Sequence, residues 1–123
     1  MCRYEGTDET PEIILDKENN KFEFIGKSMP EDVKEFYFPV MKWIDEYAKE
    51  PNKRTTVTFK MEYFNSASSK QILDILIKFE EIHNNGHEVE ILWYYFDDDE
   101  DMEDAGDAYQ EIVNIPIKLI SYQ

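Results

Sequence analysis

Apolar and polar side chains alternate most clearly between Thr56 and Gly86, and the pattern predicts a strand that runs into a helix. In the first half, every second residue is apolar or aromatic, which is the period of a strand with one buried face: Val57, Phe59, Met61 and Tyr63. In the second half, apolar residues recur at helical spacing: Ile72, Leu73, Leu76, Phe79 and Ile82. The polar residues between the two halves should form a turn and the start of the helix.

Four further strands follow from the same kind of pattern. They are predicted at residues 12–16, 21–26, 88–96 and 117–122, with the first two joined as a hairpin. Strand 88–96 becomes continuously apolar toward its end, which is typical of a strand buried on both faces. A helix should start inside the acidic residues 97–107 and end before Pro116.

The region after the hairpin should also be helical. Ser28 followed by Glu31 has the capping-box spacing, so Ser28 is the expected cap. A proline inside a helix removes a hydrogen bond and clashes with the preceding turn. We therefore expect a short helix to about Tyr37 and a second one with Pro39 in its first turn.

Strands and helices thus alternate after an N-terminal hairpin, which predicts an α/β fold. The expected architecture is a mixed, mostly parallel sheet of about five strands with helices packed against it. Residues 1–10 are polar and are expected to be flexible, which leaves residues 11–123 as a single domain. Functional loops of such sheets gather at the carboxyl ends of the strands. Asn65-Ser66 and Asp97-Asp98 should therefore be neighbours on one edge.

The charge of the chain narrows the choice of partners. It has 28 acidic against 13 basic residues, a formal net charge of -15, which disfavours nucleic acid and anionic membranes. Another protein or a cation is the more plausible partner. A single cysteine, Cys2, fits a reducing compartment, and neither a signal peptide nor a membrane span is apparent. The predicted location is the cytoplasm.

Few residues suggest chemistry. The acidic residues 97–107 do not match a calcium-binding loop, because Met102 stands where that loop needs glycine. They are more typical of a solvated surface that another protein recognises. His83 and His87 lack the further ligands of a zinc site. Because no set of nucleophile, base and oxyanion donors is recognisable, we expect neither an enzyme nor a bound cofactor or metal.

Residues 65–69, Asn-Ser-Ala-Ser-Ser, carry the other candidate site. Small hydroxyl residues at a helix start can cap the helix. Because the N-terminus of a helix carries partial positive charge, the same position can hold a phosphate. The residues alone leave both readings open, and capping is the commoner one.

Nearly the whole chain resembles the SiaC family of bacterial regulatory phosphoproteins, whose fold is like the STAS domains of anti-sigma-factor antagonists. Each matching piece is short, and their shared order makes the match strong. The pieces are Thr10-Pro11-Glu12-Ile13, Ile25-Gly26-Lys27-Ser28-Met29-Pro30-Glu31, Phe36-Tyr37-Phe38-Pro39-Val40, Trp43-Ile44, Tyr63-Phe64-Asn65-Ser66, Trp93-Tyr94-Tyr95 and Asp101-Met102-Glu103-Asp104-Ala105-Gly106.

The resemblance implies a phosphorylation switch. A cognate Ser/Thr kinase adds the phosphate, a PP2C-type phosphatase removes it, and the unphosphorylated form binds and regulates a partner, in the characterised system a diguanylate cyclase of c-di-GMP signalling. The family pattern at the site is Asn-Thr-Ser-Ser, so Asn65 matches the Asn and Ser66 matches the modified Thr. Ala67 departs from the pattern, while Ser68 and Ser69 remain as alternative acceptors.

The implied partner-binding edge is Asn65, Ser66, Ala67, Ser68, Asp97 and Asp98. Two other functions stay open. The protein could be a constitutive acidic binding subunit in which Ser66 is only a cap, or it could bind a small ligand at the strand ends.

Overall fold

The structure, a computed structural model, describes residues 1–123 and contains one sheet and three helices. The elements follow one another as β1 (Cys2–Tyr4), β2 (Glu12–Asp16), β3 (Lys21–Ser28), α1 (Val33–Tyr47), β4 (Arg54–Phe64), α2 (Ser66–Asn84), β5 (Glu88–Phe96), α3 (Glu100–Ile112) and β6 (Ile117–Tyr122). The predicted α/β class is confirmed. None of the three helices combines the length and apolar content that crossing a membrane would require.

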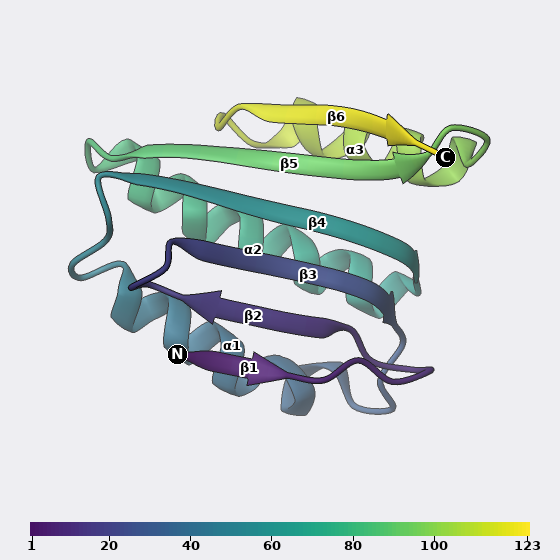
Figure 1. Cartoon of the computed structure of the whole chain (residues 1–123), viewed down its shortest axis with the longest axis horizontal. Helices are drawn as coiled ribbons and strands as arrows, with labels where there is room; N and C mark the ends of the chain where they lie inside the picture. The colour runs from purple at the N-terminus through teal and green to yellow at the C-terminus, as the bar shows by residue number, and fades with distance from the viewer.

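The six strands lie in chain order across the sheet. The pairs β1–β2 and β2–β3 are antiparallel, and the pairs β3–β4, β4–β5 and β5–β6 are parallel. Each parallel crossover moves one strand in the same direction, so crossovers of one handedness carry their helices to one face of the sheet. All three helices lie behind the sheet in Figure 1, and the opposite face is open.

The core lies between the sheet and the helices. Its largest fully buried side chains come from the strand positions that face the helices and from the helices themselves, among them Phe22, Phe24, Tyr37, Phe59, Phe79 and Trp93. Strand β5 departs from expectation, because its second face is not covered. Leu92 and Tyr94 are half-buried there, and Phe96 is 37% exposed. An apolar run signals burial on both faces only where helices lie on both sides of the sheet.

The sixth strand is β1, where the sequence predicted none. Its three residues pair with β2, Cys2 opposite Leu15 and Tyr4 opposite Ile13, and the Tyr4 ring packs against Phe36 with the ring centroids 5.7 Å apart. Three residues are too few for a period of two to be visible in the sequence.

Two expectations about the first helix are wrong. α1 is one helix, with Pro39 inside it, and its cap is Asp32, whose side chain accepts a hydrogen bond from the Glu35 amide at 3.1 Å. Pro39 is tolerated because it and Glu35, whose carbonyl it leaves without a helical donor, both face solvent. Ser28 is instead the last residue of β3 and is fully buried.

Candidate functional site

The carboxyl ends of β4 and β5 form one edge of the molecule. The two strands are parallel, with Lys60 opposite Tyr94, so Asn65 after β4 and Asp97 after β5 both emerge at this edge. Figure 1 shows β3, β4, β5 and β6 ending on the same side of the molecule. We call this region the Ser66 edge.

A β-bulge shapes the end of β4. The register with β3 shifts between Gly26 opposite Met61 and Lys27 opposite Tyr63, which leaves Glu62 as an extra residue. The shift exchanges the two faces for the residues that follow. Tyr63, predicted to lie in the core, is therefore 51% exposed, whereas Phe64 turns inward and contacts Trp93 with ring centroids 6.1 Å apart.

Asn65 is the residue that caps α2. Its side-chain Oδ1 accepts a hydrogen bond from the Ser68 amide at 2.9 Å, and its own amide donates to the Ser28 carbonyl at 3.1 Å. The turn is thus held to both the helix and β3. Because Asn65 supplies the cap, no hydroxyl of residues 66–69 is needed for it.

Ser68 lies inside the domain. It is fully buried, and its Oγ accepts a hydrogen bond from the Ser28 hydroxyl at 2.8 Å. The Ser28 hydroxyl is also hydrogen-bonded to the Tyr37 hydroxyl at 2.7 Å, and burial raises the pKa of Tyr37 to about 12. The network joins β3, α1 and α2 beneath the Ser66 edge.

Ser69 is partly buried against α3. Its hydroxyl is 3.1 Å from the Tyr109 hydroxyl, which itself donates to the Ser69 carbonyl at 2.8 Å. Burial raises the pKa of Tyr109, so its phenol keeps the proton that this bond needs.

Ser66 differs from both other serines. It is the first residue of α2, its side chain is exposed, and its hydroxyl takes part in none of the side-chain hydrogen bonds of the structure. Ala67 is exposed beside it. The structure therefore distinguishes three candidate phosphate acceptors that the sequence could not. The Ser66 hydroxyl is exposed and unbonded, the Ser68 hydroxyl is buried, and the Ser69 hydroxyl contacts Tyr109.

The first turn of α2 is also unusual in charge. It holds no acidic residue, whereas the first turn of α3 holds Glu100, Asp101 and Glu103, and Lys70 follows Ser66 by one turn. The helix dipole would therefore stabilise a negative charge added at the start of α2, and no carboxylate on the same turn would repel it.

An acidic cleft of about 350 Å³ lies between the end of β4 and the start of α3. Its walls include Glu62, Tyr63 and Phe64 on one side and Asp99, Asp101 and Met102 on the other. Asp97 and Asp98 are exposed in the loop and do not line it. Asp99 also caps α3 by accepting a hydrogen bond from the Met102 amide at 3.0 Å, a spacing that could have been read from the sequence.

The acidic side chains do not converge. No three carboxylate, imidazole or thiol groups of the chain are placed to hold a metal ion. What the Ser66 edge offers is an accessible hydroxyl beside an acidic, partly aromatic cleft, features suited to modification and to protein contact.

The class of protein is given by the family model that the chain matches, which is that of a regulatory phosphoprotein. The chain belongs to the SiaC family: the model of that family, described as SiaC family regulatory phosphoprotein, matches residues 4–122. An uncharacterised protein of Pseudomonas aeruginosa is 26% identical over 114 residues, which cover 93% of this chain and 90% of that protein.

Solved structures show the same fold. SiaC of Pseudomonas aeruginosa is 24% identical, with a TM-score of 0.89 over 98% of each chain. A second structure, of the diguanylate cyclase SiaD in complex with its activator SiaC from the same organism, gives a TM-score of 0.91 at 24% identity, over 99% of this chain and 100% of that one.

Proposed function

We propose that this protein binds and regulates a diguanylate cyclase, and that phosphorylation of Ser66 turns the binding off. The observation that carries the proposal is the exposed, unbonded hydroxyl of Ser66 at the start of α2. A kinase can reach it without opening the domain, whereas Ser68 would have to leave a buried network. The partner is suggested by the complex of the diguanylate cyclase SiaD with SiaC, because this chain has the fold of SiaC.

The proposed effect of the phosphate is local. It adds about -1.5 to -2 charges, which the amides and dipole at the start of α2 stabilise. Asn65 keeps its cap, so the domain stays folded. The same charge would stand beside the acidic cleft, where a docking partner would have to desolvate it and meet added repulsion.

A cognate Ser/Thr kinase and a PP2C-type phosphatase would set the two states. Because the kinase takes the phosphate from ATP, we propose that the cycle runs in the cytoplasm, and we assign the protein no catalytic role of its own. The Ser66 edge, including Asn65, Ala67, Asp97 and Asp98, is the proposed docking surface.

The test compares binding of four forms to the diguanylate cyclase that the unphosphorylated protein captures. Wild type and Ser66→Ala should bind alike, and Ser66→Asp and the kinase-treated protein should bind more weakly. Asn84→Asp, which adds the same charge at the other end of α2, is the matched control and should bind as wild type does. Equal binding by all the forms, with the phosphate confirmed by mass spectrometry, would leave a constitutive binding subunit instead.

A further inference from the structure

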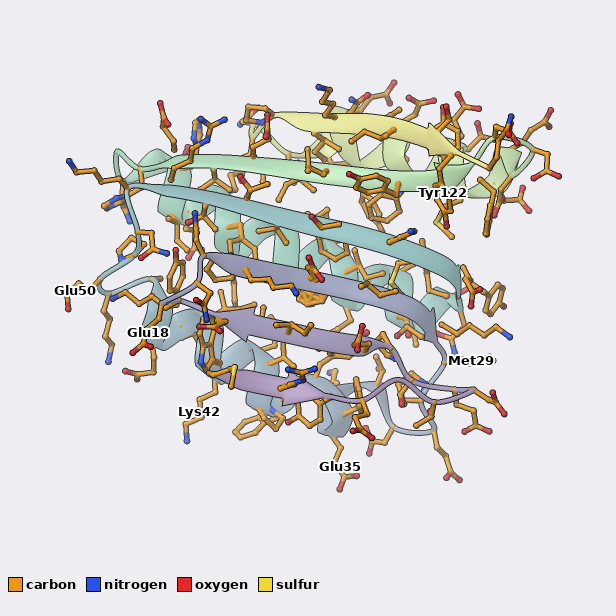
Figure 2. The ribbon with its side chains drawn as sticks, in the orientation of Figure 1. Glu18, Met29, Glu35, Lys42, Glu50 and Tyr122 are labelled. Atoms are coloured by element: carbon orange, nitrogen blue, oxygen red, sulfur yellow. The ribbon has the colours of Figure 1, made fainter.

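The open face of the sheet carries an aromatic cluster that the proposed switch does not use. We call it the open-face aromatic patch and define it as Tyr94, Phe96 and Tyr122. Phe96 and Tyr122 are opposite each other on β5 and β6, with ring centroids 4.4 Å apart, and Tyr94 and Tyr122 are 6.2 Å apart. Tyr122 lies near the carboxyl ends of the strands (Figure 2).

The patch lies on the open side because of the strand alternation. Trp93 points to the helices and donates its indole N–H to the Met102 carbonyl at 2.9 Å. Its neighbours on β5 therefore point the other way, where no helix covers them. Their rings are held partly in solvent, which is an unusual place for three adjacent aromatic side chains.

One cation already occupies this surface. The Lys60 ammonium, from β4, lies 4.6 Å from the centroid of the Tyr122 ring. An aromatic face attracts a cation through the negative charge above its ring. The contact shows that the patch can accept a positive side chain at contact distance.

Carboxylates border the same rings. The pKa of Tyr122 is raised by burial and by the negative charges of Glu62 and Asp99, so both carboxylates act on its hydroxyl. Asp97 and Asp98 follow Phe96 directly. Apart from Lys60, the surface is therefore apolar at its centre and acidic at its border, and its natural complement is a segment that is both apolar and basic.

We propose that the open-face aromatic patch binds a cationic segment of a partner protein, with arginine or lysine side chains over the rings and against Glu62 and the loop after β5. A second copy of this chain is a poor occupant, because both copies would carry a net charge of -15. The aromatic patch does not include Ser66, and its binding site shares only the loop after β5 with the proposed docking surface, so this binding goes beyond the proposed switch and exists in the unphosphorylated protein.

The test uses a short synthetic peptide of arginine, leucine and serine, and a counterpart in which glutamate replaces arginine. Each is titrated into the unphosphorylated protein while backbone amide NMR signals are followed. The arginine peptide should shift the signals of β5 and β6 around residues 94–96 and 120–122, and it should bind more weakly as salt is added. The glutamate peptide should leave these signals unchanged.

Variants decide whether the rings are responsible. Phe96→Ala and Tyr122→Ala should each weaken the peptide about two- to fivefold, the range expected for one exposed cation–aromatic contact. Phe38→Ala is the matched control: Phe38 is 64% exposed on α1 and has Lys42 Nζ 5.8 Å from its ring centroid, but it lies on the helical side. It should bind as wild type does.

Two outcomes would overturn the proposal. One is a set of shifts spread over all acidic surfaces, and the other is an equal loss of binding in Phe38→Ala. Circular dichroism of each variant separates a lost contact from a lost fold. Because no Ser66 variant enters this test, its failure would leave the proposed phosphorylation switch untouched.

Discussion

Two serines, two residues apart on α2, should respond to the same substitution in opposite ways. Ser68→Ala should destabilise the fold and leave phosphorylation intact, whereas Ser66→Ala should abolish phosphorylation and leave stability intact. The reason is their surroundings: Ser68 is fully buried and hydrogen-bonded to Ser28, and Ser66 is exposed without a side-chain bond.

The size of the effect follows from the buried network. Removing the Ser68 hydroxyl leaves the Ser28 hydroxyl, itself fully buried, without its acceptor. Such a loss costs about 1–3 kcal/mol, and the better helix propensity of alanine returns about 0.5 kcal/mol. The net loss of about 0.5–2.5 kcal/mol should lower the melting temperature by about 2–12 °C for a chain of this size. Ser66→Ala should stay within about 0.5 kcal/mol of wild type.

The assay has two readouts on the same three proteins. Thermal unfolding followed by circular dichroism measures stability, and intact-mass spectrometry after co-expression with the cognate kinase measures phosphorylation. Phosphate retained in Ser66→Ala and lost in Ser68→Ala would refute the assignment of Ser66, and an unchanged melting temperature in Ser68→Ala would refute the energetic role of the buried network.

Two further predictions concern the scaffold of the site. In Gly106→Ala, the added Cβ would lie 2.5 Å from Leu119 Cδ2 and 2.6 Å from Trp93 Cδ1, so α3 or these side chains must move. The free energy of unfolding should fall by about 1–3 kcal/mol in urea titrations, and an unchanged midpoint would contradict this packing. The pKa of Tyr37 is raised from 10.0 to about 12 by burial, so the folded state holds its proton more tightly and the resulting stability is complete below pH 10 and is lost as the pH rises toward 12. The loss of stability should be about 2.7 kcal/mol at most, and it should be smaller in Tyr37→Phe. Equal pH dependence of stability in the two proteins would show that Tyr37 ionises as easily in the folded state as in the unfolded state.

The elements of the fold were largely predictable from local pattern. The strand over Val57, Phe59 and Met61 and the helix over Ile72, Leu76 and Phe79 follow from apolar side chains repeating at the period of each element. The failures occurred where tertiary packing overrode a local rule. Pro39 lies inside α1 because that side of the helix is exposed, despite the rule against proline in helices. Ser28 has the spacing of a helix cap but is the buried last residue of β3.

The candidate site was predictable in place but not in detail. Parallel strands end at a common edge, so Asn65 and Asp97 could be placed together in advance. The bulge at Glu62 could not be predicted, because it depends on pairing with β3, and it is the bulge that exposes Tyr63 and turns Phe64 toward the core. The acidic wall of the cleft likewise comes from Asp99 and Asp101, which the start of α3 turns toward β4.

The amino-acid sequence by itself determined which segments are strands and helices, the order in which they alternate, and the small polar turn that begins α2. Periodicity reports which side chains share a face of their own element, and it carries no information about what covers that face. Only the tertiary structure decided that the helices lie on one side of the sheet and that Tyr94, Phe96 and Tyr122 meet on the other. The tertiary structure also decided that the Ser68 hydroxyl is buried in a network with Ser28 and Tyr37, which come from distant segments, and that the Ser66 hydroxyl is exposed.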